Sequence, residues 1–543
     1  MSGQPARHVL HFPLRTRALR DIIPTVAADL SLTVDGSDGE EDLVAPVIDL
    51  DAIQSDREAL LLIPESYARE RIVIPVRSEA GTLLIACEDP DDATLLSEVG
   101  LLARRRVTAA AAPRAAILSA IQQRYSAIAD VDRHVREFTE LRPSVSAETN
   151  QLVNLDERSP VVEIVNLMIS QALRDRASDI HIEPQQERVR IRYRIDGLLT
   201  DALTLPKSMA ANLTSRIKVM ASMDIVDRHR AQDGQMRVEQ NGAKVDVRVA
   251  TTETIWGEKV VLRVLDQSRV VLDLDQLGLS ESGYQRLRGL LQSPYGMIVA
   301  SGPTGSGKTT SLYAAIKEID AATKNIMTIE DPVEYTFENI NQIQIRKMAN
   351  LTFANGLKAI LRQDPDVILV GEIRDQETAE IAIQSALTGH LVLSSLHATD
   401  SAGVIQRFIE MGIEGFLLSS ALIGVLAQRL VRRICTQCRI DYQPSPDEMA
   451  LWAAHSRGAP RRFARGRGCA HCAGTGYRGR VGVFEVLTVT DEIKRLISSR
   501  ASAQPIREAA VREGMRSMRQ DAIDKVAENV TTLAEVIRCV WSN

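Results

Sequence analysis

Three stretches of the chain differ in how hydrophobic and polar residues follow one another. In the first, short apolar runs at 71–76 and 82–87 predict strands, and helices are expected from near Ala93 and over 113–127. This pattern predicts a small α+β domain, which we place at residues 1–140. The polar stretch 128–158 contains proline among serines and glutamates and is typical of a linker.

The second stretch, residues 155–266, predicts another α+β domain. Apolar residues recur at helical spacing over 161–173, directly after the helix-start sequence Ser159-Pro160. Over 189–195 four apolar residues alternate with three arginines, which predicts a half-buried strand. The remaining expected elements are a helix over 209–223 and strands over 178–183, 244–250 and 259–265.

Strand and helix patterns alternate regularly in the third stretch, residues 280–543. The expected strands are 297–300, 326–329, 367–370 and 391–396, with helices over 309–319, 356–361 and 378–387 between them. This alternation predicts a parallel sheet flanked by helices. The largest domain is therefore expected to be of the α/β class.

A glycine-rich segment joins the first of these strands to its helix. Gly302-Pro303-Thr304-Gly305-Ser306-Gly307-Lys308-Thr309-Thr310 contains the pattern G-x-x-x-x-G-K-[ST]. The glycines let successive backbone N–H groups face an anion beside a helix N-terminus. Lys308 would reach the β- and γ-phosphates, and the Thr309 hydroxyl would ligate Mg²⁺. The alternative is a turn without a ligand, but the strand–loop–helix context favours a nucleotide site.

Two other predicted strands end in acidic residues. Glu372 follows strand 367–370, and Glu330, Asp331 and Glu334 follow strand 326–329. The carboxyl ends of parallel strands meet at one edge of a sheet, so Glu372 would lie beside the phosphate loop and hold Mg²⁺ or its water. Glu330 or Glu334 would orient or deprotonate the attacking water. A surface turn with these acids splayed into solvent is the alternative.

Two histidines flank the strand 391–396. His397 ends the strand at the same expected edge and is placed to sense the γ-phosphate, whereas His390 precedes the strand. A structural role is the alternative for both.

The cysteines point to a metal site. Cys435 and Cys438 form one close pair, and Cys469 and Cys472 form a second pair. Thirty residues separate the two pairs. Four thiolates on two tight turns suit a tetrahedral, structural Zn²⁺ site, here within residues 430–480. A redox dithiol or reduced buried cysteines are the alternatives. Six cysteines in 543 residues are too few for a disulfide scaffold.

Charge and hydropathy narrow the function classes. The net charge of −6 argues against a dedicated nucleic-acid binder, yet residues 429–480 hold eleven arginines and three acidic residues. This basic segment is open to three interpretations: a solvated face, a subunit interface or a patch for anionic lipid. The sequence contains no run of about 18 apolar residues, so a membrane span is not expected. No apolar signal segment is expected near Met1.

The order of these motifs resembles the secretion ATPases of type II secretion and type IV pilus assembly. The likeness covers about residues 155–543, with a weaker match at about 60–125. The segments that carry it resemble the Walker A motif (302–309), the aspartate box (329–335), the Walker B motif (366–372) and the histidine box (388–398). The segments 178–183, 192–197 and 475–480 are also characteristic of these enzymes.

The resemblance implies a fold and a site. The fold is multidomain α/β and α+β: a RecA-like P-loop ATPase domain with a zinc-binding insertion, preceded by a PAS-like α+β domain and a small N-terminal docking domain. The family hydrolyses ATP with Mg²⁺ as a homohexamer, and arginines of the middle domain approach the nucleotide. Arg248 matches one of them. At the other position His229 stands where Arg is usual, so Arg228 or Arg230 is the substitute, and we select Arg230.

The resemblance also implies a function and partners. The expected role is to couple ATP hydrolysis to pseudopilus assembly and protein export in type II secretion, with type IV pilus extension as the alternative. The expected partners are the cytoplasmic domain of an inner-membrane secretion protein, bound through the N-terminal domain, and an inner-membrane platform protein. The protein would then work at the cytoplasmic face of the inner membrane.

Two other function classes compete with this one. The first is a nucleic-acid translocase, which the acidic charge outside 429–480 disfavours, so nucleic acid is not an expected partner. The second is a nucleotide-gated scaffold without turnover, which the acids Glu330, Glu334 and Glu372 disfavour.

Overall fold

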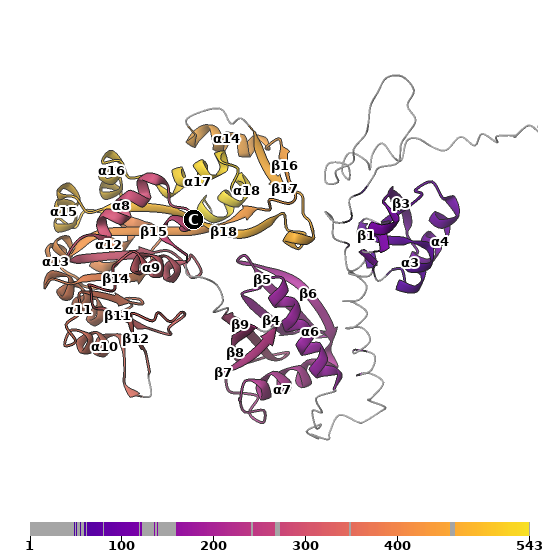
Figure 1. Cartoon of the computed structure of the whole chain (residues 1–543), viewed down its shortest axis with the longest axis horizontal. Helices are drawn as coiled ribbons and strands as arrows, with labels where there is room; N and C mark the ends of the chain where they lie inside the picture. The colour runs from indigo at the N-terminus through magenta and orange to yellow at the C-terminus, as the bar shows by residue number, and fades with distance from the viewer. Residues whose placement is uncertain are drawn as a thin grey trace, which may run out of the picture. The chain divides into compact units, whose positions relative to one another are not determined.

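The computed structural model of the chain describes residues 62–79, 81–118, 120–121, 159–240, 243–265, 272–346, 349–456 and 462–541, together with isolated positions between 48 and 60 and at 135 and 138 (Figure 1). The predicted linker 128–158 lies outside the described residues apart from two positions. Among the described residues, no helix combines the length and the apolar character needed to cross a bilayer.

The N-terminal part is built on a three-stranded sheet. Its elements are α3 (Glu65–Arg71), β1 (Val73–Glu79), β2 (Thr82–Cys87), α4 (Ala93–Ala103) and β3 (Arg106–Ala111). β2 pairs antiparallel with β1 and parallel with β3. The expected helix start near Ala93 is confirmed, because the Asp92 carboxylate accepts the N–H groups of Thr94 and Leu95 at 3.0 Å.

The middle part is an α+β unit with a fully antiparallel sheet. The strands are β4 (Asp179–Pro184), β5 (Arg188–Ile195), β6 (Leu198–Pro206), β7 (Gln232–Gln240), β8 (Ala243–Thr254) and β9 (Gly257–Leu265), and the helices are α6 (Pro160–Arg174), η1 (Lys207–Met209) and α7 (Ala210–Met220). The sheet order is β6-β5-β4-β9-β8-β7. Sequence analysis anticipated β4, β5, β8 and β9 but not the two edge strands.

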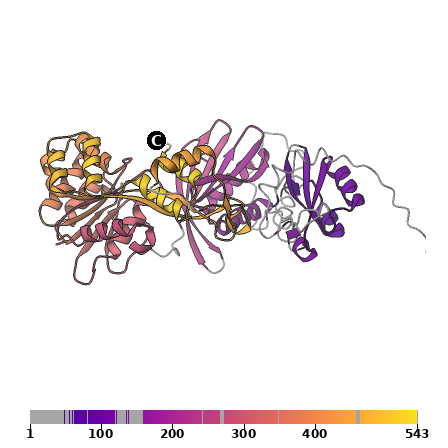
Figure 2. The ribbon, with the colours of Figure 1, turned by 90° about the horizontal axis from the view of Figure 1, so that it is seen from above.

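A seven-stranded sheet of order β12-β11-β13-β14-β10-β15-β18 organises the third part (Figures 1 and 2). Its strands are β10 (Gly296–Ser301), β11 (Ile326–Glu330), β12 (Asn341–Gln344), β13 (Val367–Val370), β14 (Leu391–Leu396), β15 (Leu422–Ile434) and β18 (Tyr477–Thr488). The four expected strands, β10, β11, β13 and β14, are confirmed and run parallel. The sequence did not predict β12, β15 and β18; β12 and β15 also run parallel to their neighbours β11 and β10, whereas β18 runs antiparallel to β15.

Helices cover both faces of this sheet. The helices before or between the parallel strands are η2 (Leu274–Leu277), α8 (Glu281–Leu291), α9 (Lys308–Lys317), α10 (Phe353–Ile360), α11 (Gln376–Leu387), α12 (Ser401–Glu410) and α13 (Gly415–Ala421). Met297 and Val299 of β10 pack into the core under α10–α13, while Ile298 and Ala300 pack into the core under η2, α8 and α9. The central strands are therefore mostly apolar, because both of their faces are buried.

The remaining elements lie in the connection between β15 and β18 and after β18. They are β16 (Arg439–Tyr442), α14 (Pro446–His455), β17 (Phe463–Gly466), η4 (Ala470–Cys472), α15 (Asp491–Ser498), α16 (Ala503–Arg512), α17 (Met518–Ala527), α18 (Leu533–Val536) and the π-helical turn η5 (Ile537–Trp541). α17, α18 and η5 pack with β15 and β18 around a core of their own that includes Val431, Val483 and Ile523.

Candidate functional site

The predicted phosphate loop joins the end of β10 to the start of α9. Gly302 and Gly307 have φ angles of 149° and 88°, which only glycine adopts easily. A Cβ atom at Gly302 would lie 2.4 Å from the backbone oxygen of Gln428 and 2.5 Å from Ser306 Oγ. The loop therefore passes too close to these atoms for position 302 to carry a side chain. The loop therefore curls tightly and leads directly into a helix N-terminus.

Lys308 lies across this loop. Its Nζ donates to the carbonyl oxygens of Gly302 at 2.8 Å and Pro303 at 3.2 Å. Burial lowers the pKa of the Lys308 ammonium, and the nearby Glu372 carboxylate opposes that shift. The ammonium therefore lies against the loop backbone, where a phosphate group could replace the carbonyl oxygens as its hydrogen-bond partner.

The other residues of the motif differ in accessibility. Pro303, Thr304 and Gly305 are exposed at the loop tip, Thr309 is half-buried in the first turn of α9, and Thr310 is exposed. Ser306 is buried, and its Oγ has no hydrogen-bond partner among the described residues. An orphaned hydroxyl and a glycine-lined cradle at a helix N-terminus fit a bound polyphosphate.

Glu372 follows β13 at the same edge of the sheet. One carboxylate oxygen lies 2.5 Å from Arg374 Nη2, and the other lies 3.9 Å from His397 Nε2. Burial and the positive charge of Lys308 lower the pKa of His397, while Glu372 opposes the shift. The expected meeting of Lys308, Glu372 and His397 beside the phosphate loop is present in the structure.

Glu330 and Glu334 occupy different environments. Glu330 is buried, and it accepts hydrogen bonds from the Tyr313 hydroxyl at 2.5 Å, the Thr328 hydroxyl at 2.6 Å and the Gln342 amide at 3.2 Å. Both of its carboxylate oxygens are therefore engaged. Sequence reasoning did not single out Tyr313 or Gln342, because a tyrosine in a helix and a glutamine in a short strand carry no motif.

Glu334 keeps contact with solvent as a residue, and its backbone N–H donates to the Tyr313 hydroxyl at 3.2 Å. Partial withdrawal from water and the charge of Glu330 raise the pKa of the Glu334 carboxyl, while Arg248 and Arg263 oppose the rise. An accessible carboxylate with a raised pKa has the properties of a general base.

His390 is not brought to this site. It immediately precedes β14, whereas the site lies where β14 ends, and its Nδ1 lies 2.9 Å from the Ser385 carbonyl oxygen at the end of α11. Its backbone carbonyl accepts the N–H of Gly296 at 3.1 Å. The structural interpretation of His390 accounts for these contacts.

The selected arginines of the middle part differ in exposure. Arg248 is half-buried on β8, and Arg230 extends from an exposed loop, with Nε 3.7 Å from Asp227 Oδ2. His229 Nδ1 lies 2.8 Å from Glu253 Oε1. The arginines of β5 are paired on the sheet, for example Arg192 with Glu183 through two bonds of 2.8 and 2.9 Å.

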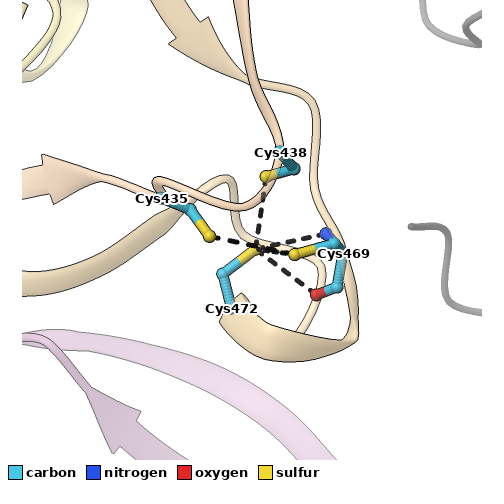
Figure 3. A group of neighbouring side chains, drawn as sticks. All are labelled: Cys435, Cys438, Cys469 and Cys472. Carbon is cyan, nitrogen blue, oxygen red and sulfur yellow. Dashed lines mark hydrogen bonds between the residues drawn. The ribbon is translucent and has the colours of Figure 1, made fainter. Parts of the chain in front are cut away.

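The four predicted metal-ligating cysteines come together from two loops (Figure 3). All are buried, and their sulfur atoms lie within 4.8 Å of one another. Three sulfur pairs are separated by 3.7–3.8 Å: Cys435–Cys469, Cys438–Cys472 and Cys469–Cys472. A tetrahedron with Zn–S bonds of about 2.3 Å has sulfur–sulfur edges of about 3.8 Å, so the thiols fit a zinc ion.

The arginine-rich segment 429–480 is partly committed to internal contacts. Arg432 binds the buried Glu535 through both its backbone N–H at 3.0 Å and its guanidinium at 2.8 Å. Arg429 Nη1 donates to the Cys539 carbonyl oxygen at 3.0 Å. Sequence analysis missed Glu535, which is about a hundred residues from its partner.

Comparisons with known proteins agree with the motif analysis. A family model described as "Type II/IV secretion system protein" matches residues 154–538, and one described as "MshEN domain" matches residues 44–130. The type IV pilus assembly ATPase PilB of Thermus thermophilus is 41% identical over 91% of this chain, and the match spans only 56% of its own length. The type II secretion system protein E of Pseudomonas aeruginosa is 46% identical over 72% of this chain and 78% of its own.

The fold has a counterpart among solved structures. The ATPase DotB of Legionella pneumophila matches 69% of this chain and 94% of its own with a TM-score of 0.51 at 20% identity, which shows a shared fold. The resemblance that the motifs indicated is confirmed: the chain belongs to the type II/IV secretion system protein family, as one of its P-loop ATPases.

Proposed function

We propose that the protein is a homohexameric motor that couples ATP hydrolysis to pseudopilus assembly and protein export in type II secretion. One observation carries the proposal. The phosphate loop, Glu372, His397 and the Glu330–Glu334 pair all follow the carboxyl ends of parallel strands of one sheet, where nucleotides bind in such folds.

Different groups at the site would bind the phosphates and the Mg²⁺ of ATP. The backbone N–H groups of the loop from Gly302 to Thr310, other than Pro303, which has none, and the Lys308 ammonium would hold the phosphates. The Thr309 hydroxyl and Glu372 would hold Mg²⁺. The bound Mg²⁺ supplies positive charge that stabilises the phosphoryl-transfer transition state. Lys308 exchanges its present carbonyl partners for phosphate oxygens.

Glu334 is the better candidate for the residue that takes the proton of the attacking water. Its carboxylate is accessible and has a raised pKa, whereas both oxygens of Glu330 already accept hydrogen bonds. Glu330 would instead fix Tyr313, whose hydroxyl also accepts the Glu334 backbone N–H. His397, next to Glu372, would report the presence of the γ-phosphate, and Arg248 and Arg230 would complete the site in the hexamer.

The partners follow from the same assignment. The N-terminal domain would bind the cytoplasmic domain of an inner-membrane secretion protein, and the motor would act on an inner-membrane platform protein. The protein would then be cytoplasmic and peripherally attached to the membrane. The tetracysteine site would hold a structural Zn²⁺. Anionic lipid is a weaker proposal, because Arg429 and Arg432 are already engaged internally.

Substitution of Lys308 tests the motor. Lys308→Ala should abolish nucleotide binding and phosphate release without changing the melting temperature. Lys317→Ala removes a lysine from the last turn of the same helix, where it pairs with Asp273, and should keep normal phosphate release. Normal turnover by the Lys308 variant would overturn the site assignment.

Type IV pilus extension is the alternative function, supported by the likeness to the Thermus PilB over 91% of the chain. Deletion of the gene separates the two proposals. Loss of exported enzymes with intact surface pili supports secretion, whereas loss of pili with normal export supports pilus extension.

A further inference from the structure

Gln428 is a buried polar residue directly beneath the phosphate loop. It lies on β15, next to the strand that carries the loop, where Ala427 is paired with Ser301. The residue is 1% exposed, and its Nε2 donates to the Ser306 carbonyl oxygen at 2.8 Å. The opposite amide orientation would place two oxygen acceptors face to face, so the donor must point to the loop.

This hydrogen bond fixes one peptide plane of the cradle. The C=O and N–H groups of a trans peptide point in opposite directions. The peptide from Ser306 to Gly307 is trans, so holding the Ser306 carbonyl toward β15 aims the Gly307 N–H away from β15. That N–H immediately precedes Lys308 and belongs to the group that faces an anion at the start of α9.

The surroundings of Gln428 indicate that it holds the phosphate loop rather than merely filling space in the core. Its Oε1 is buried without a hydrogen-bond partner among the described residues, as is Ser306 Oγ. Such orphaned groups cost free energy that an apolar side chain would avoid. A Cβ atom at position 307 would lie 3.3 Å from Gln428 Nε2, so the amide is in close contact with the backbone that it holds.

We propose that Gln428 is a positioning residue of the nucleotide site, which orients the Gly307 N–H toward the phosphates of a bound nucleoside di- or triphosphate. The proposal rests on the ATPase function above. Because the loop amides bind phosphate in both the ground state and the transition state, loss of the Gln428 donor weakens nucleotide binding more than it slows turnover.

The test measures the Kd of the full-length protein for ADP with Mg²⁺, and the KM and kcat for ATP. Gln428→Met keeps the length of the side chain and removes the donor. We expect the Kd and KM to rise roughly five- to tenfold, the effect of about one hydrogen bond, and kcat to change less than twofold. Gln428→Leu is the second variant and should show the same split between KM and kcat.

Gln406→Met is the matched control. The Gln406 amide also donates to a backbone carbonyl at 2.8 Å, but its partner is Ala501 in the connection between α15 and α16. This variant should leave Kd and KM unchanged. If wild-type protein binds no nucleotide, the proposed function fails. If wild type binds but the Gln428 variants match Gln406→Met, the positioning role alone is wrong. Failure of both Gln428 variants to fold would assign the residue to packing and overturn the proposal.

Discussion

Glu535 offers a quantitative test of how the C-terminal segment is held. Its carboxylate is fully buried and binds the guanidinium groups of Arg432 and Arg538 at 2.8 and 2.6 Å. Burial alone would raise the pKa of this carboxyl, but hydrogen bonds from Arg538 and Arg432 lower the pKa from 4.5 to about 2. The charged form of Glu535 is therefore strongly stabilised in the folded protein.

The size of the effect follows from the shift. About 2.5 pKa units correspond to about 3 kcal/mol at neutral pH, since each unit is about 1.4 kcal/mol. A folded-state pKa below the unfolded value stabilises the protein above the unfolded pKa. This contribution is therefore complete above about pH 5 and is lost as the pH falls from about 4.5 to about 2.

The perturbation is Glu535→Gln, which keeps the shape and removes the charge. We expect the melting temperature of the domain to fall by roughly 6–12 °C at pH 7, at about 2–4 °C per kcal/mol. The difference from wild type should shrink between pH 5 and pH 3, as the wild-type carboxyl becomes protonated. Differential scanning calorimetry over this pH range measures both effects.

A surface ion pair in the same domain serves as the control. Glu492 binds Arg512 at 2.7 Å, and the two side chains are 41% and 61% exposed. Glu492→Gln should cost about 0–1 kcal/mol, since exposed pairs contribute little. A Glu535 variant that melts within 1–2 °C of the Glu492 variant at pH 7 would refute the reasoning.

The remaining predictions concern catalysis and the metal. Glu334→Gln should lower kcat at least a hundredfold, because a general base contributes about 10²–10⁴-fold, while ADP binding stays intact. A variant that turns over ATP as fast as wild type would exclude Glu334 as the base. In wild type the raised pKa of Glu334 should move the acidic limb of the kcat profile above the usual glutamate range, so activity falls as the pH drops through that pKa. Purified protein should contain one zinc per chain by atomic absorption. Cys469→Ser should lose the metal and melt at a lower temperature, and full zinc occupancy in that variant would contradict a four-cysteine site.

Local patterns predicted the central strands because these are apolar on both faces and end in recognisable side chains. β13 and β14 were expected with the bounds that they have in the structure. The glycine-rich loop and the cysteine pairs are sequence signatures in themselves. Each of these features depends on neighbours within about ten positions. The family resemblance assigned these motifs to one kind of enzyme, but their positions in the chain were already evident from the local patterns.

The features that escaped prediction depend on distant partners. Neither β15 nor β18 was predicted, and their antiparallel pairing joins residues such as Gly424 and Thr488 across the tetracysteine connection. Gln428 and Glu535 are ordinary polar residues in sequence. Their contacts become visible only in the structure. There β15 places Gln428 against the phosphate loop and places Arg432 beside Glu535.

The pair Glu330 and Glu334 shows why residue type alone leaves a mechanism open. The two acids are four positions apart, and either satisfies the chemistry of a base beside the γ-phosphate. The groups that distinguish them come from elsewhere: Tyr313 from α9 and Gln342 from β12 donate to Glu330. These donors occupy Glu330, and this is why the proposed base is Glu334. We therefore expect Glu334, whose carboxylate accepts no such donors, to take the proton more readily than Glu330.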